Sequence, residues 1–188
     1  MDGIKLLSIL VLFANAATVL CAVLILASKL GYFRKYWLKV EKLIQSRSLK
    51  LVLLVSVVAA FGSLYLSEIR AFPPCKLCWF QRIFMYPIPV LVLTSIYRKT
   101  KDLFQYLMPL SFIGMLIAGY HYYLQLNPNP YAPCGDIGFS VSCSENFFTH
   151  FGYITIPWMS FSAFLVIFSV SLLMSGSDNP GVSRHKFS

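Results

Sequence analysis

Two pairs of cysteines are the residues of this sequence whose type and spacing could do chemistry. Cys75 and Cys78 form the motif Cys-Lys-Leu-Cys, and Cys134 and Cys143 follow further along the chain. A disulfide across a two-residue spacer closes so short a loop that it removes little chain entropy, which makes it a poor structural staple. The same Cys-x-x-Cys spacing is typical of reversible dithiol chemistry. The spacing therefore predicts that Cys75 and Cys78 are a redox-active pair.

The residues around this motif favour a reactive thiolate. Pro73 and Pro74 end the preceding helix, and we expect Trp79 to open the next one. Cys78 would then lie at a helix N-terminus, where the helix dipole favours a thiolate. A thiolate of this kind is also a good leaving group in disulfide exchange.

Other uses of the cysteines remain open at this point. Cys134 and Cys143 would suit a structural disulfide, and four cysteines in two pairs could form a tetrahedral zinc site. The second spacing is long and no ligand-rich segment surrounds it, so we predict no metal. Covalent haem is excluded at the first motif because a histidine does not follow Cys78. We expect Cys21, which is alone in an apolar run, to be a small buried residue.

Three polar residues fall within or beside apolar runs, where such side chains are costly. Arg82 follows Cys78 by one helical turn on the same face, and Gln81 is its neighbour. His121 ends a later apolar run at the same level. Arg82 could instead reach the headgroups or pair with Glu68. The convergence of a cation and an imidazole near a dithiol nevertheless indicates a binding site.

The chemistry of the dithiol defines what this site must bind. Oxidation of two thiols to a disulfide releases two electrons and two protons. The sequence shows no glycine-rich nucleotide loop, haem ligand pair or iron-sulfur cysteine set. A lipid-soluble quinone accepts two electrons and two protons, so we expect menaquinone or ubiquinone. Arg82, with His121 and Gln81, could polarise its carbonyl and stabilise the developing negative charge.

The composition identifies the elements that must position these residues. Of 188 residues, 57% are hydrophobic and 12% are charged, which excludes a soluble enzyme, a disordered binder and a small secreted disulfide scaffold. A membrane-spanning helix needs about 20 apolar residues. The formal net charge of +9 reflects membrane topology, and no nucleic acid partner is expected. Apolar runs that meet this length are residues 6–27, 51–67, 79–97, 103–121 and 153–174.

Lysine and arginine residues set the orientation, because short positively charged loops stay on the cytoplasmic side. The connection between the fourth and fifth runs, residues 122–152, contains no lysine or arginine. The N-terminus and both cysteine loops are therefore expected outside, in an oxidising compartment. The expected cytoplasmic loops contain Lys29, Arg34, Lys35, Lys39, Lys42, Arg47 and Lys50, and Arg98, Lys99 and Lys101.

The fold class follows as an all-α integral membrane protein. We expect a four-helix transmembrane bundle with an additional N-terminal transmembrane helix, which is too long for a typical cleaved signal peptide. Aromatic and aliphatic residues recur at helical spacing between the basic residues of the first loop, which predicts an interfacial amphipathic helix. The expected divisions are residues 1–50 for these N-terminal elements, 51–175 for the core and 176–188 for a disordered tail.

The segment Cys75-Lys-Leu-Cys78-Trp-Phe-Gln81-Arg82 resembles the Cys-x-Leu-Cys-x-x-Gln-Arg signature of the disulfide bond formation protein B (DsbB) family. The stretch from His121 to Cys134 and the Ile-Pro-Trp entry to the last run are also similar to that family. The resemblance covers roughly residues 51–174. It implies a quinone-coupled thiol oxidase of the bacterial inner membrane, with a four-helix core. The implied partner is a soluble, extracytoplasmic thioredoxin-like oxidase that is kept oxidised so that it can form disulfides in exported proteins.

The resemblance also implies roles by position. Cys134 would form the mixed disulfide with the partner, Cys143 would exchange with Cys75, and Cys78 would face the quinone beside Arg82, with His121 near the same ring. The second cysteine pair is closer together than in the best-known members and is more similar to the BdbC-type branch. The N-terminal helix and amphipathic segment are additions to the family pattern.

Two competing functions predict different behaviour. A vitamin K epoxide reductase-like oxidase is also a helical bundle with Cys-x-x-Cys, but its motif is expected late in the chain, on the last helix pair. A non-enzymatic membrane scaffold would have two unreactive disulfides and no defect specific to Cys78.

Overall fold

A computed structural model describes residues 3–30, 32–100, 102–127 and 142–177. Within these ranges the chain is helical, and its only strand pairing is an isolated bridge between His150 and Ile154. Five helical stretches are long and apolar enough to cross a membrane, which confirms the all-α membrane fold. The elements are α1 (Gly3–Lys29), α2 (Arg34–Leu64), a π-helical turn η1 (Tyr65–Ile69), α3 (Lys76–Met85), α4 (Pro87–Arg98), α5 (Leu103–Leu126) and α6 (Ile156–Ser177).

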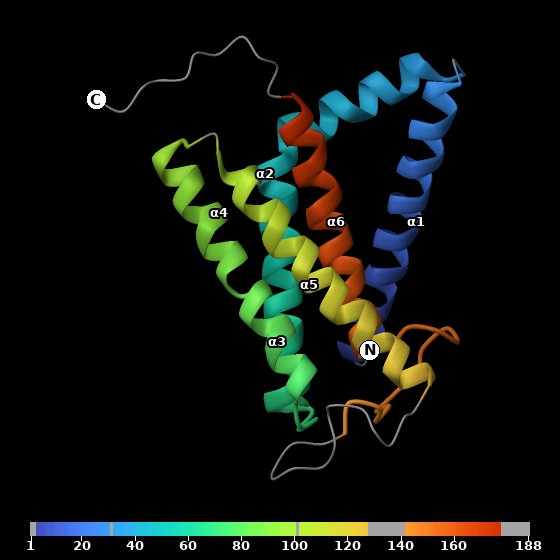
Figure 1. Cartoon of the computed structure of the whole chain (residues 1–188), viewed down its shortest axis with the longest axis vertical. Helices are drawn as coiled ribbons and strands as arrows, with labels where there is room; N and C mark the ends of the chain where they lie inside the picture. Colours follow the sequence, from blue (N-terminus) through green and yellow to red (C-terminus); the bar gives the residue numbers. More distant parts are fainter. Residues whose placement is uncertain (1–2, 31, 101, 128–141, 178–188) are drawn as a thin grey trace.

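The helices run between two ends of a bundle (Figure 1). At one end, α3 begins and α5 ends, and we call this the cysteine end because Cys75 and Cys78 lie there. At the other, α4 ends and α6 ends, and we call this the basic end because it includes Arg98 and Lys99. The alternation expected from the distribution of lysine and arginine along the chain is therefore present in the arrangement of the helices.

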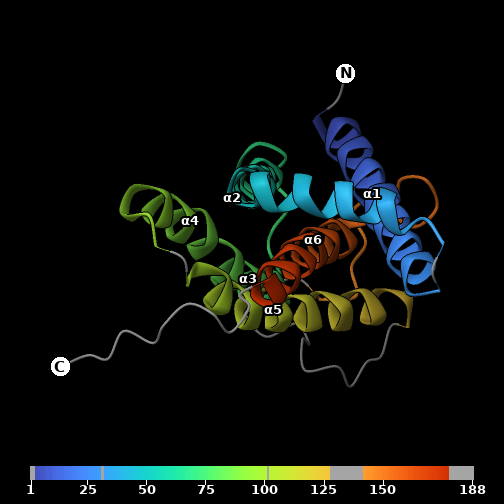
Figure 2. The ribbon, with the colours of Figure 1, turned by 90° about the horizontal axis from the view of Figure 1, so that it is seen from above.

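The predicted amphipathic segment is the first part of α2. It crosses the basic end of the bundle, and the second part of α2 then runs along the bundle (Figure 1). This is the geometry expected for a helix that lies on a membrane surface before it enters the bilayer. Seen from above, α1 lies at one side of the molecule, where it packs against α2 and α6 (Figure 2).

The core lies between α2, α4, α5 and α6. Val52, Ile88, Leu107 and Phe164 are fully buried there and belong to one apolar cluster. α5 and α6 pack closely at Gly114 of α5, where an added Cβ atom would overlap the ring of Phe164 on α6. The absence of a side chain at this position lets α5 and α6 approach each other, which fixes His121 two turns further along α5.

The predicted third span is interrupted. α3 and α4 meet at Tyr86, because Pro87 has no backbone N–H to donate to the preceding turn and so kinks the helix. Two bounds also differ from expectation: α3 begins at Lys76 instead of Trp79, and α5 continues to Leu126 beyond His121. α3 begins earlier because the side chain of Cys75 caps it.

Several sequence predictions fall elsewhere in the chain. Cys134 and residues 178–188 of the predicted tail lie outside the described residues. The division into residues 1–50, 51–175 and 176–188 stays a prediction. The expectation of a buried Cys21 is wrong, because this residue is only half-buried on a helix with a largely exposed surface.

Candidate functional site

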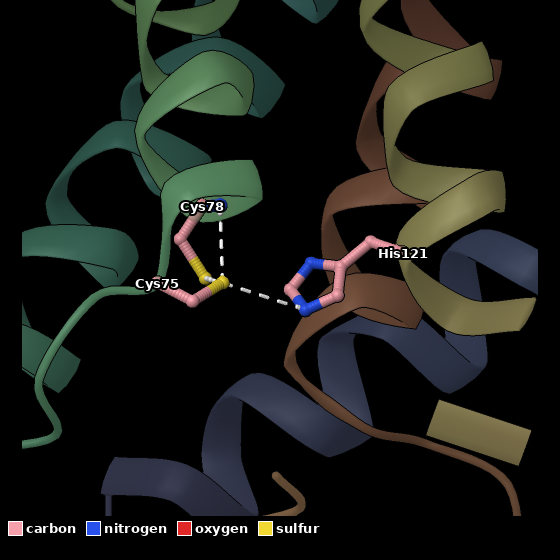
Figure 3. Close-up of side chains that lie close together, drawn as sticks. All are labelled: Cys75, Cys78 and His121. Carbon is pink, nitrogen blue, oxygen red and sulfur yellow. Dashed lines mark hydrogen bonds between the residues drawn. The ribbon is translucent and has the colours of Figure 1, made fainter. Parts of the chain in front are cut away.

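The first turn of α3 brings its two cysteines together. Cys75 is the N-cap residue, with extended backbone, and its sulfur accepts a hydrogen bond from the backbone N–H of Cys78 at 3.3 Å. Both cysteines are free thiols, and their sulfur atoms lie 3.0 Å apart (Figure 3). The side chain of Cys75 therefore satisfies a helix N–H that would otherwise lack a partner, and this holds the dithiol in one geometry.

A buried histidine completes this arrangement from α5. His121 Nε2 lies 3.6 Å from the sulfur of Cys75, and Nδ1 lies 2.9 Å from Nε2 of Gln81 (Figure 3 shows the first contact). The exposed fractions of the three side chains are 3% for Cys75, 2% for His121 and 5% for Gln81. Because the amide nitrogen of Gln81 donates to Nδ1, the neutral ring carries its proton on Nε2, toward Cys75.

These contacts stabilise the Cys75 thiolate. The pKa of the Cys75 thiol lies well below its ordinary value, chiefly because the Cys78 thiol donates a hydrogen bond to its sulfur. Hydrogen bonds from His121 and from the Cys78 backbone N–H act in the same direction, whereas burial acts against them. The sequence led us to expect the thiolate at Cys78, but the hydrogen bonds at this helix N-terminus converge on Cys75.

Cys143 packs against the same site. It is 1% exposed, is engaged in a disulfide, and forms a buried cluster with Cys75 and Leu124. The segment around it is attached to α5 by a hydrogen bond from the side chain of Gln125 to the backbone oxygen of Glu145 at 2.9 Å. The structure thus brings a second-loop cysteine next to the Cys-x-x-Cys motif, as disulfide exchange between them requires.

Arg82 is attached to α2. Its Nε donates to Ser63 Oγ at 3.0 Å, its Nη2 donates to the Ser63 backbone oxygen at 3.2 Å, and its guanidinium lies 5.2 Å from the ring centre of Trp79. No ion pair joins Arg82 to Glu68 among the described residues, and Glu68 instead accepts a hydrogen bond from Ser67. The guanidinium is therefore positioned by neutral groups.

A cavity of about 480 Å³ lies beside these residues, between α1, α2, α3 and α6. Its lining is mostly aliphatic, and its polar groups include Cys78, Gln81 and Arg82. Cys78 therefore belongs both to the dithiol and to the cavity wall. A pocket that is mainly apolar with a few convergent polar groups is the type of site in which small molecules bind.

Tyr86 gives this cavity a further polar group. It lies one turn beyond Arg82 and lines the cavity, and its hydroxyl is buried without a hydrogen-bond partner among the described residues. A buried hydroxyl without a partner is costly, and a ligand with an acceptor oxygen would satisfy it. A quinone has such oxygens on an otherwise apolar body, so the cavity residues fit the acceptor expected from the sequence.

The structure brings together most of the predicted site residues, with one difference. Gln81 and Arg82 line the cavity, whereas His121 is not among the lining residues and contacts Cys75 and Gln81 instead. Sequence reasoning missed Tyr86, although its position four residues after Arg82 places both on one helix face. It also missed Ser63, for which the sequence contained no signal.

A metal site is a separate possibility for the same atoms. The ligand atoms of Cys75, Cys78 and His121 all lie within 4.8 Å of one another, which suits a soft divalent ion when both cysteines are reduced. With Cys143 in a disulfide, its thiolate is not available as a further ligand in this state of the protein.

Comparisons with known proteins agree with the geometry of the site. Residues 45–174 match the family model described as disulfide bond formation protein DsbB. The chain is 40% identical over 124 residues to the probable disulfide formation protein C of Halalkalibacterium halodurans, covering 64% of this chain and 88% of that protein. It is 38% identical over 127 residues to disulfide bond formation protein C of Bacillus subtilis, covering 66% and 90%. No solved structure matches the chain.

Proposed function

Because this chain belongs to the DsbB family of disulfide bond formation proteins, we propose that it oxidises an extracytoplasmic thioredoxin-like protein and passes the electrons to a membrane quinone. The family accounts for the general role, which is the generation of disulfides by a membrane protein. The observation that carries the quinone proposal is the position of Cys78, which is both half of the dithiol and part of the cavity wall with Arg82.

Electron entry begins at the second cysteine pair. A thiolate of the partner attacks Cys134 in a disulfide with Cys143, and the partner's second thiolate then resolves the mixed disulfide. The partner leaves oxidised, and two electrons remain on Cys134 and Cys143 as two thiols. The burial of Cys143 against Cys75 supports entry at Cys134, because Cys143 itself is 1% exposed.

Exchange between the two pairs then moves the electrons inward. The Cys143 thiolate attacks the Cys75 sulfur of a Cys75–Cys78 disulfide, and Cys78 leaves as a thiolate. The Cys134 thiolate next attacks Cys143, and Cys75 leaves. The second disulfide is restored, and the two electrons now lie on Cys75 and Cys78.

The buried contacts of Cys75 favour this last departure. A leaving thiolate of low pKa departs faster, and Cys75 has hydrogen bonds from Cys78 that lower its pKa, with His121 acting in the same direction. Gln81 holds His121 in the orientation that presents Nε2 to the sulfur. We assign His121 to the dithiol, and Gln81 to both sites, since it lines the cavity and bonds the imidazole.

A bound quinone supplies an acceptor for the two electrons and two protons of the dithiol, which returns to the disulfide. Arg82 and Tyr86 would hold its carbonyl oxygens, since both present donors to the cavity. Preorganised donors of this kind act at the point where negative charge develops, and each can contribute several kcal/mol to the rate.

The orientation proposed from the sequence is consistent with electron entry from a partner at the cysteine end. The cysteine end would face the outside of a bacterial inner membrane, where the partner is found, and the basic end would face the cytoplasm.

The scaffold alternative is less well supported, because Cys75 and Cys78 are free thiols in contact with a histidine instead of a structural disulfide. The motif also opens the core at α3, which disfavours the vitamin K epoxide reductase-like alternative.

The experiment is steady-state turnover of the purified protein in nanodiscs with a reduced thioredoxin-like partner and added menaquinone or ubiquinone under argon. We expect partner oxidation only with quinone present. Cys78→Ser should abolish turnover, and Arg82→Gln should slow it by about a hundredfold, as for other lost donors at a developing negative charge.

The matched control is Cys21→Ser, which changes a cysteine on α1 that lies outside the dithiol and should leave turnover unchanged. Partner oxidation that proceeds equally without quinone, or in the Cys78→Ser variant, would show that the electrons leave by another route.

A further inference from the structure

α1 lies outside the part of the chain that matches the family, and yet it forms a wall of the cavity. The family match begins at residue 45, whereas α1 ends at Lys29. The cavity is lined on this side by four residues at helical spacing: Leu7, Leu10, Val11 and Ala14. The opposite walls come from α2, α3 and α6, which belong to the matched core.

α1 is attached to the core by specific contacts near the cysteine end. Ser8 is fully buried, and its hydroxyl lies 2.7 Å from Nδ1 of His150, in the segment before α6. Gly62 of α2 allows close approach, because a Cβ atom there would lie 3.2 Å from the side chain of Leu7. The position of α1 against the cavity is therefore determined by packing and hydrogen bonding together.

The cavity is polar at one end and apolar along its length. Cys78, Gln81 and Arg82 lie toward the cysteine end, as does Leu66 of η1. Toward the middle of the bundle the lining includes Leu54 of α2, Val166 of α6 and Ala14 of α1, all apolar. Because a helix rises 1.5 Å per residue, the wall from Leu66 to Leu54 extends over roughly 18 Å. This length exceeds what a quinone ring alone would occupy.

We propose that α1 forms the binding subsite for the isoprenoid tail of the quinone. This inference rests on the proposed function, and it adds a role for the helix that the family pattern lacks. With the ring at Arg82 and Tyr86, the tail lies along Leu10, Val11 and Ala14. A phospholipid acyl chain could fill the same apolar volume, and its ester oxygens could accept hydrogen bonds from Tyr86 and Arg82, so the test below separates the two ligands.

The test is a binding measurement that does not depend on turnover. Quinones quench tryptophan fluorescence, and Trp79 lies beside Arg82. We would titrate the full-length protein in nanodiscs with menaquinone-4, which has a tail, and with menadione, which has none. Ala14→Phe should fill the tail subsite and weaken menaquinone-4 binding by about tenfold, with menadione binding unchanged.

Two further variants keep the result interpretable. Ala16→Phe adds the same ring to an exposed position of α1 that does not line the cavity, and it should behave as wild type. Leu10→Ala removes lining without adding bulk, so it tests the subsite even where Ala14→Phe fails to fold. It should also weaken menaquinone-4 binding selectively.

The other outcomes contradict either the tail subsite or the proposed function. If wild type binds both quinones and neither Ala14→Phe nor Leu10→Ala changes the ratio of their affinities, α1 does not hold the tail; this is also the result expected if a phospholipid occupies the cavity. Equal weakening of both quinones would overturn the tail subsite as well. If wild type binds neither quinone, the proposed function itself fails.

Discussion

Cys75 is the residue on which the interactions of the site converge. Hydrogen bonds to its sulfur from a thiol, a backbone N–H and an imidazole stabilise the thiolate form of Cys75. Its lowered pKa means that the thiolate persists as the pH falls below the ordinary range of a thiol. Arg82 lies on the same helix and shares the cavity wall with Cys78.

The first prediction concerns the pH dependence of Cys75. In a Cys78→Ser background, where the serine hydroxyl still donates to the sulfur, the reaction of Cys75 with iodoacetamide should reach half its maximal rate below the ordinary thiol pKa. Adding His121→Ala should raise this midpoint, and Gln81→Leu should raise it less. The measurement is the alkylation rate against pH, followed by peptide mass spectrometry.

A purely structural role for His121 would alter stability without moving that midpoint. Gln81→Asn, which keeps an amide on a shorter side chain, is the matched comparison for Gln81→Leu. Identical pH profiles in all these variants would remove His121 and Gln81 from the control of Cys75.

The second prediction concerns Tyr86. Its hydroxyl has no partner among the described residues, so Tyr86→Phe should leave the thermal unfolding midpoint unchanged or raise it slightly. The KM for quinone should rise by about tenfold, which corresponds to one lost hydrogen bond. Tyr97→Phe, at an exposed position of α4, is the control and should change neither quantity. A fall in stability with unchanged KM would show that the hydroxyl serves the fold.

At this scale the sequence located the reactive residues but not all their partners. Cys-x-x-Cys spacing and the one-turn offset of Arg82 are local features, and local features can be read from a sequence. The pairing of Gln81 with His121 joins residues on two helices, and the attachment of Arg82 to Ser63 joins α3 to α2. Such pairs depend on how helices pack, which the sequence pattern did not determine.

At the scale of elements, α1 is the feature that distinguishes this chain from the family core. It presents many exposed apolar side chains, and its buried residues, Ile4 and Ser8, lie in its first two turns. Stability of its attachment therefore depends on contacts near the cysteine end, where the cavity opens between α1 and α3.

The third prediction tests this attachment. Ser8→Ala would leave Nδ1 of His150 without its hydrogen bond, at a cost of about 1–3 kcal/mol. We expect faster hydrogen exchange in the first turns of α1 and a lower unfolding midpoint. Ser28→Ala, which removes a hydroxyl bonded within α1 itself, should have a much smaller effect. Equal exchange in the two variants would mean that the Ser8 contact does not hold α1.

Helix existence was predictable from apolar run length, whereas helix bounds were not. The start of α3 depends on a cysteine acting as N-cap, a role more usual for serine, threonine, aspartate or asparagine. Pro87 marks the position of the interruption at Tyr86 in the sequence. The interruption is compatible with one membrane span, because α3 and the kinked α4 together are long and apolar enough to cross a membrane.

At the scale of the whole molecule, the two ends of the bundle differ in charge and chemistry. The basic end carries Arg98 and Lys99, and the cysteine end carries the thiols. Apolar run lengths and the lysine and arginine distribution were sufficient to predict this layout, because both reflect the cost of charge in a bilayer. The cavity was not predictable, since it depends on the exact separation of α1 from the core.

The fourth prediction concerns orientation. Native Cys75 is nearly fully buried, and Cys143 is both buried and in a disulfide, so labelling of these cysteines with a membrane-impermeant maleimide would not report their side of the membrane. Cysteines introduced at exposed positions avoid this problem. Glu145→Cys, at the cysteine end, should be labelled in intact cells, and Arg98→Cys should be labelled only after permeabilisation. The reverse pattern would invert the proposed topology.

The most direct test of the central claim is a stoichiometric titration of the fully reduced protein with quinone under argon, without any partner. The redox state of each cysteine would be read by differential alkylation and mass spectrometry. We predict that one equivalent of quinone oxidises one pair of cysteines, with one equivalent of quinol formed. In a Cys134→Ser, Cys143→Ser variant, which cannot exchange disulfides between the loops, this pair should be Cys75 and Cys78, and Arg82→Gln should slow the step. Cysteines that remain reduced in the presence of excess quinone would contradict the transfer of electrons from this dithiol to a quinone.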